Sequence, residues 1–160
     1  MKTNTNFDLI DKSKVSFLEN ILGSKFLYKK KIAPYGAHWI FFNENFNKKD
    51  LGLDGHPKRG KNIPLLKGYK RMFAGANLVF KKKIYFEDKI KKKTEIKSLL
   101  KKRSDNKNIY FLNLANTFFR DNLEVLKEIQ TIVFVKNNHV SNRDKKKSKN
   151  INLKFLHKRN

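Results

Sequence analysis

Cysteine is absent from the 160 residues of the sequence. Its absence excludes disulfides, thiolate zinc sites and cysteine nucleophiles, so stability must come from an apolar core or from association with another chain. Long apolar runs are missing too, since none approaches the roughly 18 residues that cross a membrane. Residues 1–14 also lack the apolar stretch of a secretory signal. We therefore expect a cytoplasmic protein without a membrane partner.

Acidic residues are scarce. The 14 Asp and Glu stand against 38 Lys and Arg, which gives a formal net charge of +24. Such a charge attracts polyanions at low salt, although an AT-rich genome would also produce a lysine-rich surface. The lysines form short clusters along the whole chain, and no compact aromatic and basic motif occurs. We therefore do not expect nucleic acid as the main partner, but a polyanion-binding protein stays open as an alternative.

Apolar residues are sufficient for a core. They make up 39% of the chain and include 14 Phe, which suits a single domain of this length. Residues 136–160 are instead basic and polar and end in a small apolar group, namely Ile151, Leu153, Phe155 and Leu156. We expect a folded domain over residues 1–135 and a disordered tail over residues 136–160.

Helical patterns occur in the first third of the chain. Residues 14–22 place apolar side chains at helical spacing, and Gly23 follows as a C-cap, so they predict a helix. Residues 35–46 (YGAHWIFFNENF) are densely aromatic and predict a buried helix. Residues 47–66 combine Gly, Pro and polar residues, which indicates a long ordered loop.

The rest of the chain favours strands. They are predicted over residues 78–86, 89–101, 109–119 and 125–135, with turns at 104–108 and 120–123. In the third strand one face carries Tyr110, Leu112, Leu114 and Asn116. In the second strand, a single bend lets four side chains point inward, namely Ile90, Thr94, Ile96 and Leu99. Helices followed by antiparallel strands make an α+β fold.

The most specific stretch is LGLDGHPKRG at residues 51–60, followed by RMFAGA at residues 71–76. His38 and Trp39 precede both. The combined spacing resembles the mesaconyl-CoA hydratase group and the similar mitochondrial 3-hydroxyacyl-thioester dehydratases, whose HW-aromatic segment precedes a DGHPKRG loop and an RMWAGG stretch. EIQTIVF at residues 128–134 is similar to an EEQDIVY-like strand of the same group. The resemblance covers about residues 15–135.

The resemblance implies a single hotdog fold of the MaoC-like class, in which an antiparallel sheet wraps around a central helix. Here that helix would be residues 35–46. Family enzymes contain two hotdogs, and the second carries an acid–base motif similar to HRIHYD, which residues 136–160 do not contain. We therefore expect either a subunit that acts with a second hotdog, as a heteromer or a homodimer, or a half that has lost catalysis. The implied substrate is an enoyl or 3-hydroxyacyl thioester of CoA or an acyl carrier protein.

Candidate catalytic residues are few. Asp54 and His56 are weak candidates for an acid–base pair, because they lie two residues apart in a loop where structural roles are more common. No cofactor is implied. His139 and His157 lack metal-ligand spacing, so we expect no metal site.

Candidate binding residues come from the same motifs. Lys58, Arg59 and Arg71 can bind carrier phosphates, although either arginine can instead tie the loop to the sheet. Three aromatic residues can line an acyl tunnel or simply form core, namely Trp39, Phe42 and Phe73. His38 favours a structural role, with a hydrogen bond inside its loop.

Overall fold

A computed structural model describes residues 3–26, 31–43, 46–52, 56–58, 63–104 and 107–136. Its strands are β1 (Asn4–Leu9), β2 (Tyr69–Phe80), β3 (Lys89–Ser104), β4 (Lys107–Arg120) and β5 (Leu123–Lys136). Its helical segments are the α-helix α1 (Lys12–Leu22) and the 3-10 turns η1 (Ala37–Ile40) and η2 (Lys48–Asp50).

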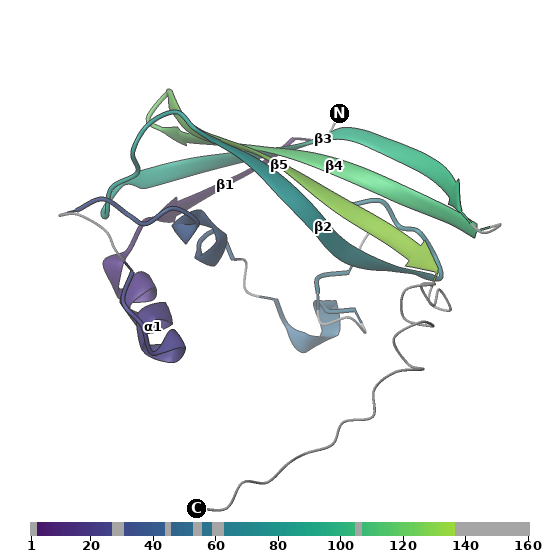
Figure 1. The fold of residues 1–160 in the computed structure, drawn as a ribbon, viewed down its shortest axis with the longest axis horizontal. Coiled ribbons are helices and arrows are strands. Elements are labelled where there is room, and N and C mark those ends of the chain that lie inside the picture. Colours follow the sequence, from purple (N-terminus) through teal and green to yellow (C-terminus); the bar gives the residue numbers. More distant parts are fainter. Residues whose placement is uncertain are drawn as a thin grey trace, which may run out of the picture.

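The strands form one five-stranded sheet in the order β1-β3-β4-β5-β2. Every pairing is antiparallel. The sheet is curved, and α1, η1 and η2 all lie below its concave side (Figure 1). The expected α+β class is therefore confirmed, with a single antiparallel sheet above the helical segments.

The core lies between the concave face and the segments below it. Inward positions of β4 alternate as the sequence predicted, since Leu112, Leu114, Asn116 and Phe118 are buried. Two groups of apolar side chains result. The larger contains Ile10, Val15, Ala33, Phe41, Phe86, Ile90, Phe118, Val125 and Leu126. The smaller contains Leu112, Leu114 and Phe134.

The helix predicted over residues 14–22 is confirmed as α1, which begins two residues earlier. The Asp11 side chain accepts a hydrogen bond from the Ser13 backbone N–H at 2.8 Å and caps the first turn. Gly23 adopts the left-handed conformation at the other end, with φ of 63°. Both ends are thus fixed by local sequence.

The central helix predicted over residues 35–46 is wrong. Within the described part of this segment, helical geometry is confined to the short turn η1, and the chain is extended again at Phe41. Tyr35, Trp39 and Phe46 are exposed rather than buried. The physical reason is that aromatic residues and glycine are poor helix formers, so only tertiary contacts could have kept this segment helical. The contacts that form hold a turn instead.

Strand positions need smaller corrections. The strand predicted over residues 78–86 lies earlier, as β2, and the chain turns after Phe80. β1 was not predicted, because it is short and mostly polar. The expected bend in β3 is a register shift between Ile96 and Ser98. Ile90 is buried as predicted, whereas Leu99 stays exposed.

The expected loop at 47–66 and tail at 136–160 are described only in part. Among the described loop residues are η2 and an isolated bridge between Leu51 and Pro57. Residues 137–160 lie outside the described residues, so the domain boundary near residue 135 stays a prediction.

Candidate functional site

A row of polar side chains crosses the concave face where the core would otherwise be apolar. Thr94 on β3 pairs with Asn116 on β4, which pairs with Glu128 on β5. The Thr94 hydroxyl donates to Asn116 Oδ1 at 2.7 Å, and Asn116 Nδ2 donates to Glu128 Oε2 at 2.9 Å. Glu128 is only 1% exposed. The register of β3, β4 and β5 is therefore enough to bring Thr94, Asn116 and Glu128 together.

The turn η1 closes over this row from below. Trp39 Nε1 donates to Glu128 Oε1 at 2.7 Å, and Gln130 Nε2 donates to the same oxygen at 3.0 Å. His38 Nε2 lies 3.8 Å from that oxygen, which is an electrostatic contact longer than a hydrogen bond. The turn is thus tied to β5 through a buried carboxylate.

Glu128 is held in its charged form. Burial acts to raise its pKa, but His38 and the donors Trp39, Asn116 and Gln130 together outweigh that effect and lower the pKa to about 2. A carboxylate that is ionised at every ordinary pH and sealed from solvent is a poor general acid or base. The hydrogen bonds of Glu128 suit a structural role instead, in which its carboxylate holds η1 against β5.

His38 is buried between aromatic rings rather than bonded within its loop. Its ring centroid lies 5.4 Å from that of Phe118 and 6.0 Å from that of Phe80. Neither ring nitrogen has a hydrogen-bond partner within the part of the chain that the structure describes. The hydrogen bond expected for His38 is therefore not formed among the described residues. The structural role expected for His38 agrees with its buried position.

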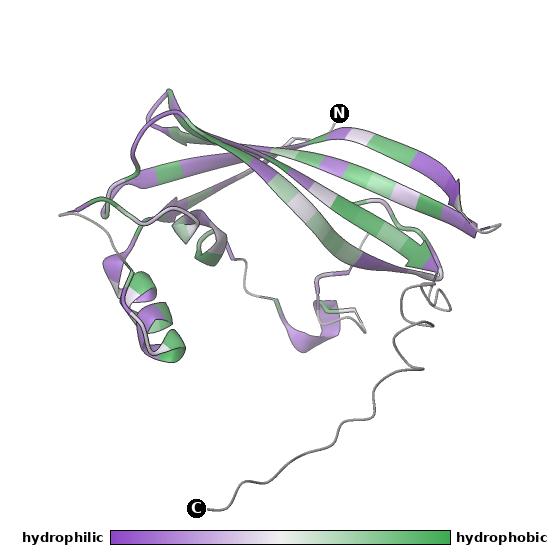
Figure 2. Ribbon diagram, in the orientation of Figure 1, coloured by the Kyte–Doolittle hydropathy of each residue, from purple (hydrophilic) through white to green (hydrophobic). Residues whose placement is uncertain are grey.

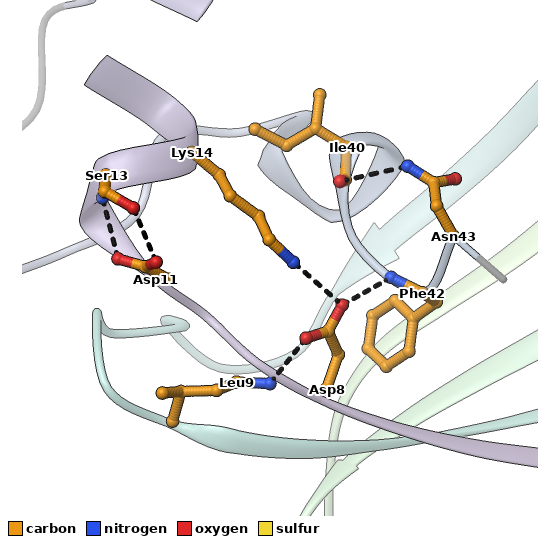
Figure 3. Close-up of polar contacts among 8 residues, drawn as sticks. All are labelled: Asp8, Leu9, Asp11, Ser13, Lys14, Ile40, Phe42 and Asn43. Atoms are coloured by element: carbon orange, nitrogen blue, oxygen red, sulfur yellow. Dashed lines mark hydrogen bonds and ion pairs between the residues drawn. The ribbon is translucent and has the colours of Figure 1, made fainter. Parts of the chain in front are cut away.

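Asp8 of β1 fixes the chain directly after η1 (Figure 3). Its Oδ2 accepts from the Phe42 backbone N–H at 2.7 Å and from Lys14 Nζ at 3.4 Å. Phe42 has a φ of 61°, a conformation that non-glycine residues rarely adopt. Asp8 thus holds strained backbone in place and directs the Phe42 ring against Phe118, with centroids 5.5 Å apart.

The candidate aromatic residues lie in different surroundings. Phe42 is partly buried against the core, whereas Trp39 is 52% exposed and Phe73, on β2, is 62% exposed. Next to η1 is a pocket of about 220 Å³. Its lining is mostly apolar and comes from residues 32–38 and from the segment after β2, with Ile10, Tyr35, His38, Phe80, Lys82 and Lys83 among its members. An acyl chain is the kind of ligand that such a lining suits.

The candidate charged residues are only partly described. Asp54 and Arg59 lie outside the described residues. His56 and Lys58 are exposed, and their backbone groups close the loop, because Gly52 N–H donates to His56 O and Lys58 N–H donates to Asp50 O. Arg71 is half-buried on β2, with its Nε and Nη2 atoms inside the protein.

β2 forms one edge of the sheet, and β1 the other. The β2 edge carries exposed apolar side chains, namely Met72, Phe73 and Val79. Gly75 has a φ of 156° and lies at a register shift in the pairing of β2 with β5. An edge of this kind is suited to pairing with another sheet.

Two groups were missed by reasoning from the sequence: the Glu128 cluster and Asp8. A signal for Glu128 existed, because it falls on the inward face of an alternating strand between Leu126 and Phe134. No comparable local signal marks Asp8. Among the described residues no group of His, Asp and Glu could hold a metal ion. Within the same residues no helix is long and apolar enough to cross a membrane.

Comparison with solved structures identifies the class of fold. The chain is similar to a chain of the ChsH1-ChsH2 complex from Mycobacterium tuberculosis, with a TM-score of 0.63 and 12% identity over 87% of this chain and 85% of that one. It is also similar to a chain of the HadBC (3R-hydroxyacyl-ACP dehydratase) complex from the same organism, with a TM-score of 0.55 and 14% identity over 82% and 96%. The fold is therefore a hotdog, as the resemblance implied.

Sequence comparison then gives the family. Residues 36–160 match the profile of hydroxyacyl-thioester dehydratase type 2, and the chain belongs to that family. It is also 27% identical over 97 residues to the mesaconyl-C(4)-CoA hydratase of Chloroflexus aurantiacus. The match takes in 61% of this chain but only 35% of that relative, so the chain spans about a third of the relative's length.

Proposed function

We propose that this chain is the substrate-binding hotdog of an acyl-thioester hydratase or dehydratase, and that a second hotdog supplies the acid–base pair. The substrate would be an enoyl or 3-hydroxyacyl thioester of CoA or an acyl carrier protein. The observation that carries the proposal is the contrast inside the site. The buried Glu128 carboxylate holds η1 in place through its hydrogen bonds, whereas the apolar pocket next to η1 can receive a ligand.

The chemistry explains why a second unit is needed. Adding or removing water at an enoyl thioester requires one group to deprotonate water and another to handle the α-proton, with donors that polarise the carbonyl. Glu128 is 1% exposed and accepts hydrogen bonds on both oxygens, so it does not reach a substrate. His38 lines the pocket next to η1, but among the described residues no second acid–base group beside it is free to act. His56 is exposed, and with Asp54 it remains the weak alternative for an acid–base role.

Binding is assigned to the candidate residues as follows. Lys58, Arg59 and Arg71 would contact carrier phosphates. Trp39, Phe42 and Phe73 would contact the acyl chain, in agreement with the exposure of Trp39 and Phe73. None of the three lines the apolar pocket next to η1, so they would contact a part of the acyl chain outside it. The second hotdog would pair along β2, whose edge is open in the sheet and lined by exposed apolar side chains.

The test is reconstitution. The chain alone should not hydrate crotonyl-CoA or mesaconyl-CoA, and adding a hotdog unit with an HRIHYD-like motif from an adjacent gene should give turnover. Sedimentation should show the two units together. Robust turnover by the chain alone would mean that Asp54, His56 or His38 performs the chemistry. A stable monomer that ignores the second unit would contradict the proposal.

A basic hotdog that binds a polyanion is the competing function, and the net charge of +24 favours it. A salt titration separates the two, because loose electrostatic association weakens steeply with salt. DNA binding that persists at physiological ionic strength, together with failure of reconstitution, would favour the competing function.

A further inference from the structure

The pocket next to η1 has a buried end and an open end. Three of its lining residues are almost completely buried, namely Ile10, Ala33 and His38. Three others are exposed, namely Tyr35, Lys82 and Lys83. A ligand would therefore enter beside the tyrosine and the two lysines, and its leading end would meet the buried residues.

The walls between the two ends are apolar. They are formed by Ile32, Pro34, Ala37, Phe80 and Ile84. Figure 2 shows the same change in character along the segment that links β2 with β3, which begins hydrophilic and then becomes hydrophobic. An apolar cavity of about 150 Å³ takes up benzene, so this pocket of about 220 Å³ holds a chain of about eight carbon atoms.

Four carboxylates near the pocket stay charged, but each is balanced by a neighbouring cation. The pairs are Asp8 with Lys14, Asp11 with Lys12, Asp88 with Arg120, and Glu124 with Lys81. Together these pairs add no net charge to the surroundings of the pocket.

Positive charge remains at the opening. None of the described lining residues is acidic, whereas Lys82 and Lys83 are both basic. Within residues 81–88 only Glu87 is left to oppose them, and residues 31–38 add Lys31 but no acid. Neither lining lysine forms an ion pair with another described residue. The pocket thus combines an apolar interior with a cationic opening.

We propose that this pocket binds a free aliphatic carboxylate with a chain of about eight carbon atoms. The chain lies against the apolar walls, and its methyl end points to the buried residues. The carboxylate stays at the opening, within reach of the flexible side chains of Lys82 and Lys83 and of the Tyr35 hydroxyl. Ammonium groups donate strong, charge-assisted hydrogen bonds to such an anion.

A free acid suits the opening better than a thioester for a chemical reason. The acyl carbon of a thioester is bonded to sulfur and carries no charge, and the carrier phosphates lie at the far end of the pantetheine arm. Neither group places an anion beside the two lysines. A bound free acid would exclude the acyl chain of a thioester and so act as an inhibitor. The proposal goes beyond the proposed function and does not depend on it, because binding needs neither the second hotdog nor a reaction.

The test is equilibrium dialysis of the full chain with labelled acids from butyrate to dodecanoate. Affinity should rise about fourfold for each added methylene group and level off beyond about eight carbon atoms. 1-Octanol, which has the same chain without the charge, should bind about fivefold more weakly than octanoate. Equal binding of octanol and octanoate, or no saturable binding of octanoate, overturns the proposal.

A filled pocket tests the location of the chain. Ala33→Leu adds a side chain at the buried end and should lower octanoate affinity at least tenfold, as expected when about two methylene groups are excluded. Ile84→Phe narrows the pocket from a half-buried position and is the second variant if Ala33→Leu does not fold. The matched control is Ala74→Leu, the same change at an exposed position of β2. Circular dichroism checks folding, and undiminished octanoate binding by the folded pocket variants overturns the proposal.

Charge is tested separately. Lys82→Gln with Lys83→Gln should lower octanoate affinity about fivefold and leave octanol binding unchanged. The control is Lys97→Gln with Lys101→Gln, which removes the same net charge from exposed positions of β3, a strand that does not line the pocket. Equal loss in both double variants means that net charge alone attracts the acid, and overturns the proposal. Octanoate binding without turnover in the reconstituted complex would contradict only the proposed function, whereas turnover without octanoate binding would contradict only this site.

Discussion

Replacing Glu128 by Gln tests the buried cluster directly. The amide has nearly the same shape as the carboxylate but no charge, so packing is kept. Trp39 and Gln130 donate to one carboxylate oxygen and Asn116 donates to the other. The introduced amide would turn an N–H₂ group toward one of these donors and leave a buried donor without an acceptor. We therefore expect clear destabilisation at neutral pH.

The magnitude follows from the pKa. A fall in the pKa of Glu128 from 4.5 to about 2 corresponds to about 3 kcal/mol of folding free energy. The folded-state pKa lies below the unfolded one, so this stability is fully present above pH 4.5 and is lost as the pH falls toward 2. By pH 3 about 2 kcal/mol of it should be gone.

The assay is urea unfolding at pH 7 and pH 3, followed by fluorescence of Trp39, the only Trp in the chain. The difference in unfolding free energy between wild type and Glu128→Gln should be about 2 kcal/mol smaller at pH 3 than at pH 7. Other carboxylates titrate in both proteins and cancel in this comparison. Glu95→Gln, at an exposed pair with Lys93 that also lowers the pKa of Glu95, should show a much smaller effect of the same sign, because water screens the exposed pair. An equal difference at both pH values would refute an ionised Glu128 in the folded state.

Three further changes test the supports of η1 and the core, each by urea unfolding. Trp39→Phe keeps a smaller aromatic ring but removes a donor to the Glu128 carboxylate, and should cost about 1.5–3 kcal/mol; unfolding is followed by circular dichroism because this variant has no Trp, and no change would mean that the hydrogen bond adds nothing. Asp8→Ala frees the strained turn at Phe42 and should cost about 1–3 kcal/mol, whereas Asp8→Asn, which keeps an acceptor, should cost less. Phe118→Ala empties a position that is 1% exposed and should cost about 3–5 kcal/mol; a cost below about 1 kcal/mol would show that the core collapses into the space.

The local sequence was sufficient to locate the strands in which apolar and polar side chains alternate. Alternation located β3, β4 and β5 to within a few residues, and it correctly grouped Leu112, Leu114 and Asn116 on one face, which the structure shows to be the buried one. Gly23 correctly marked the end of α1. These predictions succeeded because side-chain alternation and helix capping are set by neighbouring residues.

The combined motifs in residues 38–76 and 128–134 were sufficient to suggest the family and the hotdog fold. Both are borne out by the family match and the structural neighbours. The motifs did not determine which residues act chemically, and the roles of Lys58, Arg59 and Arg71 stay predictions. A short motif shows that a segment is shared, but not what its side chains contact.

Tertiary structure alone decided the shape of the chain around η1. The density of aromatic residues indicated a buried helix, yet the segment is a turn held by Asp8, which lies 34 residues before Phe42. Trp39 is bound by Glu128, 89 residues later. Contacts between such distant residues depend on strand register and on which side of the sheet a segment passes. The aromatic pattern therefore indicated that the segment around η1 contacts the core. The conformation of this segment depends instead on its hydrogen bonds with the carboxylates of Asp8 and Glu128.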